Sequence, residues 1–119
     1  MNGNNESTSF DPRMVTTSIS LDGFMVTQNL GIVKGIIVRS RSIVGNIGAS
    51  IQSIFGGNIS IYTAMCEKAR DDTYNLMCNH AQSLGANAII SVRYDTNEIA
   101  PGLSEVLCYG TAVIVQKTA

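Results

Sequence analysis

The stretch Leu84-Gly-Ala-Asn-Ala-Ile-Ile-Ser-Val-Arg-Tyr-Asp95 carries more structural information than any other part of this chain. Gly85 is typical of the residue that ends a helix, because glycine adopts a left-handed backbone without strain. The adjacent Ile89 and Ile90 indicate a strand that is buried on both faces. The stretch therefore predicts the end of a helix followed directly by a core strand.

A second stretch, Glu105-Val-Leu-Cys-Tyr-Gly-Thr-Ala-Val113, predicts the partner of that strand. Pro101 and Gly102 lie between the two and are strong turn residues. We therefore expect strands over 88–96 and 104–117, paired antiparallel as a hairpin.

Before the hairpin, the hydrophobic residues recur at helical spacing. Earlier in the chain, they have the pattern of strands. Nine residues fall on one stripe of a helix expected from about Ile59 to Leu84: Tyr62, Met65, Cys66, Ala69, Thr73, Leu76, Met77, His80 and Leu84. A second helix, without any charged residue, is expected around Ile43–Phe55. Phe24–Thr27 and Gly31–Arg39 are rich in β-branched residues and predict strands. Gly31 and Gly35 are expected to mark a bulge or a close approach of backbones.

The order strand, helix, helix, strand, strand predicts an α+β fold with two layers. The helices cover one face of an antiparallel-containing sheet. We expect a single domain over residues 13–119, preceded by a mobile polar arm over residues 1–12. This arm has no apolar core and does not resemble a signal peptide, so three cysteines indicate free thiols in a reducing cytoplasm.

Composition limits the partners of the protein. Only 14% of the 119 residues are charged, compared with roughly 25% in ordinary domains. A small domain with so few charges is expected to bury part of its surface against copies of itself, as a homo-oligomer. The net charge of −1 offers no basic surface for nucleic acid. The longest uncharged run, Ser42–Cys66, is too polar to span a membrane.

Four residues are candidates for binding a soft divalent metal such as zinc: Cys66, Cys78, His80 and Cys108. None forms the close pair that zinc sites use, and Cys66 and Cys78 lie twelve residues apart on one predicted helix. Cys78 and His80 point about 200° apart on that helix. Within one subunit the simpler interpretation is that Cys66 and Cys108 are small core residues. In a symmetric ring, however, one Cys or His from each subunit could meet at a common axis.

Other constellations give weaker signals. We assign no catalytic residue, because His80 is the only histidine and Cys108 is the only thiol that a strand-on-helix contact could bring to it. Asp95 is expected to face Glu105 across the hairpin. Either a hard cation bridges these carboxylates with help from Glu98, or Arg93 neutralises them.

A third possibility is a small anionic ligand bound between subunits. Its anchor would be an arginine, for which Arg39, Arg41 and Arg70 are the candidates. Ordinary solvated surface or structural pairing is the more common role of such residues.

Taken together, these residues resemble those of the YbjQ-like family, which is described as heavy-metal-binding. The resemblance covers about Val15 to Val115 and rests on these motifs: Thr16-Thr17, Gly31-Ile-Val33, Tyr62, Ala69-Arg-Asp-Asp72, Met77, Ala81, Leu84-Gly-Ala-Asn-Ala88, Val92-Arg-Tyr-Asp95, Glu105-Val106 and Tyr109-Gly-Thr-Ala-Val113.

This resemblance implies a dodecin-like α+β fold, a homopentamer and no established enzyme activity. The chain departs from the family pattern at two places. Ile36 follows Gly35 where the family commonly has glutamate, and Asn58 follows the double glycine where an arginine is common. The first departure removes a carboxylate from any shared cation site.

Overall fold

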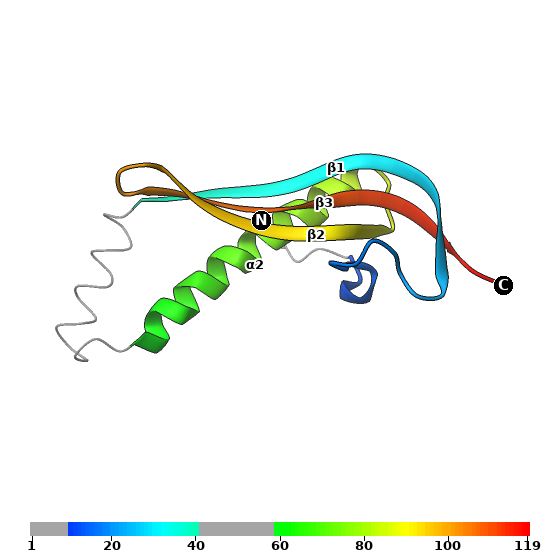
Figure 1. Cartoon of the computed structure of the whole chain (residues 1–119), viewed down its shortest axis with the longest axis horizontal. Coiled ribbons are helices and arrows are strands. Elements are labelled where there is room, and N and C mark those ends of the chain that lie inside the picture. The colour runs from blue at the N-terminus through cyan, green and yellow to red at the C-terminus, as the bar shows by residue number, and fades with distance from the viewer. Residues whose placement is uncertain (1–9, 41–58) are drawn as a thin grey trace, which may run out of the picture.

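The computed structural model describes residues 10–40 and 59–119. It contains a short 3₁₀ helix η1 (Pro12–Met14), strand β1 (Phe24–Ser40), helix α2 (Ile59–Ser83) and strands β2 (Ala88–Ala100) and β3 (Leu103–Lys117) (Figure 1). The α+β class is therefore confirmed, and the long helix and the hairpin lie where the sequence predicts them. The uncharged helix predicted around 43–55 lies outside the described residues.

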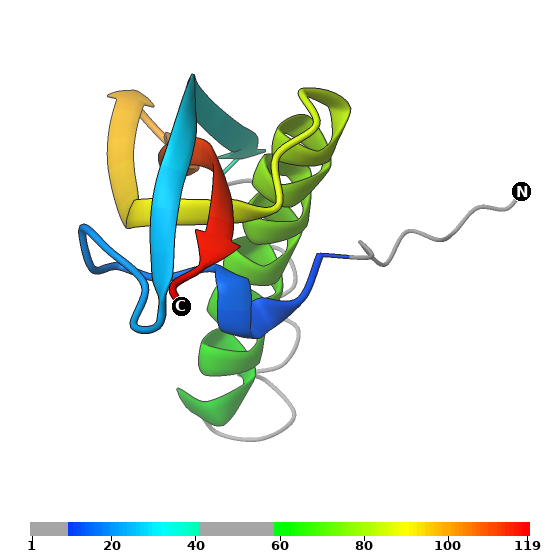
Figure 2. The same cartoon turned by 90° about the vertical axis from the view of Figure 1, so that its right-hand side faces the viewer.

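The three strands form one antiparallel sheet in the order β1-β3-β2, and α2 packs against one face of it (Figure 2). β1 is one long strand, whereas the sequence predicts two shorter ones. Its ladder continues through irregularities between Val26 and Gln28 and between Asn29 and Gly31. Gly31 has a φ of +100° there, and its N–H is bound by the side chain of Asn29. The predicted bulge is thus present at Gly31.

The loop after α2 explains the sequence Leu84-Gly-Ala-Asn-Ala88. Gly85 has a φ of +85°, and its N–H donates to the carbonyl of Gln82, while that of Ala86 donates to Ala81. These two bonds close the helix as a Schellman motif. The Asn87 side chain then bonds both the N–H and the carbonyl of Val115, at 2.8 and 3.0 Å. The loop is therefore tied to β3 before β2 begins.

The register of the hairpin corrects one expectation. Asp95 lies opposite Leu107, and Glu105 lies opposite Asn97. The two carboxylates are therefore diagonal neighbours and do not face each other. The strands continue closer to the turn than the sequence predicts, and the Glu98 carboxylate accepts a hydrogen bond from the N–H of Gly102.

The buried side of α2 also differs from the predicted stripe. Ala69, Thr73 and Met77 are buried as expected, but the stripe continues through Cys78 and Ala81. The expected positions Leu76 and Leu84 are 45% and 43% exposed, and Cys66 and His80 are exposed too. The stripe is rotated because α2 approaches the sheet most closely over Gly35, next to Thr73 and Met77.

The core lies in two places. The larger cluster fills the space between α2 and the sheet and includes Val33, Met77, Ile89 and Cys108. Phe10, which the sequence places in the polar arm, packs against this cluster. A smaller cluster lies on the opposite face of the sheet, where Met14, Leu21 and Phe24 cover Ala88, Val113 and Val115.

The N-terminal segment also extends the sheet edge. Val15 bridges to Ile89, and the N–H groups of Ser91 and Val92 donate to the carbonyls of Ser18 and Thr16. Ser91 has a φ of +57°, which places it in the left-handed region at this irregularity in β2. Among the described residues, no helix is both long enough and apolar enough to cross a membrane.

Candidate functional site

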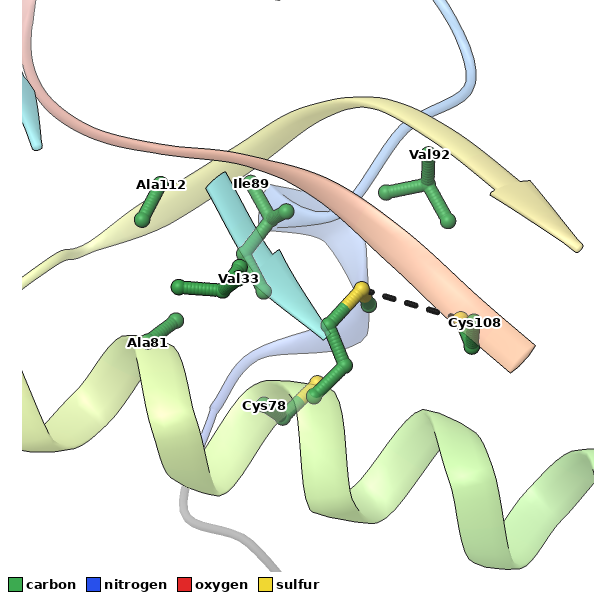
Figure 3. Packing of buried hydrophobic residues seen from close by; sticks show 8 residues of the cluster. Val33, Cys78, Ala81, Ile89, Val92, Cys108 and Ala112 are labelled. Carbon is green, nitrogen blue, oxygen red and sulfur yellow. Dashed lines mark hydrogen bonds between the residues drawn. The ribbon is translucent and has the colours of Figure 1, made fainter. Parts of the chain in front are cut away.

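Three sulfur-containing side chains are buried between α2 and the sheet, and two of them are in contact. Met77 and Cys78 come from consecutive positions of α2, and Cys108 comes from the central strand β3 (Figure 3). The Cys108 thiol lies 3.6 Å from the Met77 thioether and donates to it. All three side chains have no solvent exposure. We refer to Met77, Cys78 and Cys108 as the sulfur cluster.

One tyrosine lies near each thiol of the sulfur cluster. Tyr74 precedes Cys78 by one helical turn, and its hydroxyl opposes the effect of burial on the pKa of that thiol. Tyr94 lies opposite Cys108 in the β2–β3 register, and its hydroxyl opposes the effect of burial on the pKa of Cys108. Helix periodicity places the first pair together and strand pairing the second.

The environment keeps both thiols protonated at neutral pH. Burial raises the pKa of Cys78 and raises that of Cys108 to about 11, because the thiolate loses its hydration. The tyrosine hydroxyls oppose this shift, since a hydrogen bond to the thiolate lowers the thiol pKa. Burial likewise raises the pKa of Tyr94 to about 12. A buried thiol with a raised pKa is a poor nucleophile, so the arrangement does not favour covalent catalysis.

A positive charge lies beside this site. The Arg70 guanidinium stacks over the Tyr94 ring, 5.2 Å from the ring centroid. Its charge favours the thiolate form of Cys108 and lowers the pKa of that thiol. Tyr94 itself is 37% exposed.

The four predicted metal ligands divide into two groups. Cys78 and Cys108 share the buried sulfur cluster, whereas Cys66 and His80 are exposed on α2. Within residues 10–40 and 59–119, no three His, Cys, Asp or Glu side chains gather around one point. His80 and Cys108, the only pair considered for catalysis, are not brought together. Instead, His80 Nδ1 accepts a hydrogen bond from the backbone N–H of Lys34, at 3.3 Å.

Of the arginines predicted to anchor an anionic ligand, the two that the structure describes have partners within the protein. Arg39 lies 3.6 Å from the Asp72 carboxylate, which also binds Lys68. Arg70 stacks on Tyr94, and Arg41 lies outside the described residues. Arg93 donates to the carbonyls of Thr17 and Val92.

Sequence reasoning missed three members of the buried site. Met77 was interpreted only as a core residue, and Tyr74 and Tyr94 were not considered. The spacing Tyr74–Cys78 was a usable signal, because residues four apart share a helix face. Tyr94 lies opposite Cys108 only in the observed register of the hairpin. The register expected from the turn residues differs from it by two residues.

Comparisons with known proteins agree with this architecture. Residues 13–116 match a family described as "YbjQ_1: Putative heavy-metal-binding". A "UPF0145 protein" from Chromobacterium violaceum is 59% identical over 107 residues, covering 90% of this chain and 92% of its own length. A relative with the same UPF0145 designation from Burkholderia thailandensis is 57% identical over 103 residues, covering 87% and 93%.

Among solved structures, a DUF74-family protein of unknown function from Pediococcus pentosaceus has a similar fold. Its TM-score is 0.55 at 17% identity, and the match covers 86% of this chain and 96% of that one. At this identity the likeness supports the fold alone. The family match and the close relatives together extend over nearly the whole chain, and the protein therefore belongs to the YbjQ (UPF0145) family.

Proposed function

We propose that this protein works as a cytoplasmic homo-oligomer whose subunits join through the uncovered part of the sheet. The observation that carries the proposal is an apolar surface on the face opposite α2. Ile32, Ile36 and Val38 of β1 point away from the helix and are 73%, 41% and 52% exposed. We refer to these three residues, together with Leu107 opposite Ile36 and Tyr109 opposite Lys34 on β3, as the open face.

The two ends of this sheet face differ in a way that supports the proposal. The N-terminal segment covers one end with Met14 and Leu21. The open face has no comparable cover from the described residues. Large exposed apolar patches on soluble proteins mark interaction sites. A second copy of the chain would bury it.

The edge of the sheet supports the same conclusion. β1 is an edge strand of 17 residues, and no described strand pairs with its outer side. Long unpaired edges are templates for pairing with another chain. Lys34 of β1 and Asp95 of β2 bring charges of opposite sign to the same face, which suits self-association. A head-to-tail contact of this kind closes into a ring when the rotation between subunits permits, and we propose five subunits.

Native mass spectrometry and light scattering test this assembly. We expect the purified wild-type protein to contain five chains, and Ile36→Glu to dissociate it, because a charge would be buried in the contact. Leu84→Glu is the matched control, since Leu84 is 43% exposed in the turn that follows α2 and lies away from the open face. A monomeric wild-type protein would contradict the proposal. Circular dichroism confirms that each variant is folded.

Heavy-metal binding at subunit contacts is a second candidate function. Cys66 and His80 are the two predicted ligands that a neighbouring subunit can reach, because both are exposed on α2. Native mass spectrometry with added zinc tests this candidate. We expect bound zinc in the wild-type oligomer and its loss in Cys66→Ser and His80→Gln. Unchanged zinc binding in both variants would exclude these residues as ligands.

A further inference from the structure

Each outer strand of the sheet is capped by the chain itself over one half only. On β1, the backbone N–H of Lys34 donates to His80 of α2. On β2, the N-terminal segment bonds to the outer side as far as Val92. Beyond these points, the described residues bring no further strand to either edge. The two uncapped halves lie at the same end of the sheet, next to the hairpin turn (Figure 1).

The backbone groups that β1 presents at its uncapped edge follow from its ladder. The pairing of β1 with β3 is regular from Gly31 to Ser40. In such a ladder both polar backbone groups of one residue point to the same side, and successive residues alternate. Lys34 points away from β3, since its N–H donates to His80 Nδ1 at 3.3 Å. The backbone groups of Ile36 and Val38 therefore point outward as well.

Tyr109 of β3 gives the corresponding pattern on β2. It lies opposite Lys34 on one side and opposite Arg93 on the other. Because Lys34 points away from it, Tyr109 bonds to Arg93, whose backbone groups therefore point inward. The residues of β2 that point their backbone groups outward are Tyr94, Thr96 and Glu98.

The side chains impose a second, independent condition on any strand that joins these edges. Ile36 lies on the open face, and Asp95 and Asn97 lie on the same face of β2. Side chains at one level of neighbouring strands share a face, so Ile36 must lie level with Asp95 or Asn97. An antiparallel pair needs both level residues to point their backbone groups at each other or both away. Ile36 points outward and Asp95 and Asn97 point inward, which excludes that arrangement. In a parallel pair, a residue bonds to the two neighbours of its level partner, and these edges satisfy that pattern.

We propose that Ile36–Val38 of β1 pairs in parallel with Tyr94–Glu98 of β2 from the next subunit, so that one sheet continues through the ring. The proposal rests on the proposed assembly and names the two edges through which its subunits join. A ring requires the same direction of pairing. β1 and β2 are both antiparallel to β3 and so run the same way, and rotation about the ring axis preserves that direction.

Charge selects one of the two registers. With Ile36 level with Asp95, Lys34 would lie beside Arg93 of the next subunit, and like charges side by side are destabilising. With Ile36 level with Asn97, Lys34 lies beside Asp95 instead. β1 contains no acidic residue, and the uncapped part of β2 contains Asp95 and Glu98. Closing a sheet into a ring also requires a stagger between strands.

Proline at position 96 tests the backbone pairing. In this register the N–H of Thr96 donates to the carbonyl of Lys34 in the next subunit. Proline lacks that N–H but is tolerated on an edge strand where the N–H points away from the sheet. We expect Thr96→Pro to stay folded by circular dichroism and to lose the ring in native mass spectrometry. Thr96→Val is the matched control, because it keeps the N–H and should remain assembled.

Cysteine pairs in a Cys66→Ser background test the register. Ile36→Cys combined with Asn97→Cys places the two thiols level across the contact. The spacing of about 4.8 Å between neighbouring strands lies within the Cα separation of a disulfide. Mild oxidation should link as many as five chains on a non-reducing gel. Ile36→Cys combined with Asp95→Cys is the control and should not link chains, because Cα atoms more than about 7 Å apart are not bridged.

Charge reversal gives a readout that does not depend on a backbone change. Lys34→Glu should raise the concentration at which the ring dissociates at least about tenfold, because two carboxylates then lie side by side. Adding Asp95→Lys to Lys34→Glu should return that concentration to within about threefold of the wild type, since the pair is restored with its signs exchanged.

The outcomes separate this proposal from the assembly on which it rests. An assembled wild type whose Thr96→Pro variant is equally assembled, with no disulfide between positions 36 and 97, would overturn the edge pairing and leave the homo-oligomer standing. A disulfide between positions 36 and 95 in place of 36 and 97 would overturn the register. A monomeric wild type would overturn both the assembly and the pairing.

Discussion

Gly35 of β1 lies directly against the backbone carbonyl of Thr73 on α2, and no methyl group fits between them. A Cβ at this position would also stand 2.7 Å from the Cβ of Leu76 and 2.8 Å from the backbone nitrogen of Met77. The absence of a side chain here lets the helix settle onto the sheet. This approach determines which side of α2 is buried and brings Met77 to Cys108.

Gly35→Ala should therefore destabilise the fold. The added methyl group meets backbone atoms, which cannot rotate away, so the cost should lie near the upper end of the roughly 1–3 kcal/mol typical of overpacking. Urea unfolding followed by circular dichroism measures it. Gly110→Ala is the control, because its Cβ would stand 2.9 Å from the Ile89 side chain and 3.0 Å from the Ile90 carbonyl oxygen. These contacts are less severe than those at Gly35, so this substitution should cost less. Equal stability of Gly35→Ala and the wild type would contradict the close approach.

Asn87→Ala should loosen the junction between α2 and β2. The substitution leaves the N–H and carbonyl of Val115 without their side-chain partner, and each unsatisfied group costs about 1–3 kcal/mol. We expect a loss of that order in the free energy of unfolding. Asn79→Ala, at an exposed position of α2, should change stability by less than about 0.5 kcal/mol.

The stability of the protein should fall as the pH rises from about 9 to about 11. In the unfolded chain Cys108 loses its proton near its ordinary pKa of 9.0, whereas burial raises its pKa to about 11 in the folded state. Between these values the unfolded state binds fewer protons, so deprotonation favours unfolding. Below pH 9 this contribution is constant.

Urea midpoints measured at pH 7.5, 9, 10 and 11 test this linkage. Cys108→Val removes the titrating thiol and should flatten the pH dependence. Part of the slope should remain, because burial also raises the pKa of Tyr94 to about 12. Identical slopes for Cys108→Val and the wild type would show that this thiol is not the source.

The three thiols should differ sharply in reactivity. Cys66 is exposed, whereas Cys78 and Cys108 are buried with raised pKa values, and the thiolate is the reactive form. In the native protein, a disulfide reagent at pH 8 should modify Cys66 quickly and the other two only as slowly as the protein opens. All three should react at once in denaturant. Rapid native modification of Cys108 would contradict the packing around it.

The sequence predicted the elements well where a local rule was strong. Gly85 terminates α2 as expected because its left-handed backbone closes a Schellman motif. The Pro101-Gly102 turn places the hairpin correctly. Gly31 and Gly35 were both singled out, and the structure assigns the bulge to Gly31 and the close approach to Gly35.

Predictions that depended on how two elements pack or pair with each other were less successful. The stripe on α2 was misplaced toward Leu76, His80 and Leu84, because helical spacing gives a period but does not say which neighbour the helix meets. Asp95 and Glu105 were placed opposite each other, because turn residues alone did not set the register. Cys66 was expected in the core together with Cys108 but is exposed, because only the packing of α2 on the sheet decides which thiols are buried.

The sequence by itself determined the α+β class, the helix end at Gly85 and the antiparallel hairpin, because each depends on residues that are close together in the chain. It also determined the family. The tertiary structure alone decided that Met77 contacts Cys108, that Tyr94 lies opposite Cys108, and that Ile32, Ile36 and Val38 face outward. These relationships depend on how closely a helix packs on a sheet and on strand register, and both are set by long-range packing that no local pattern encodes.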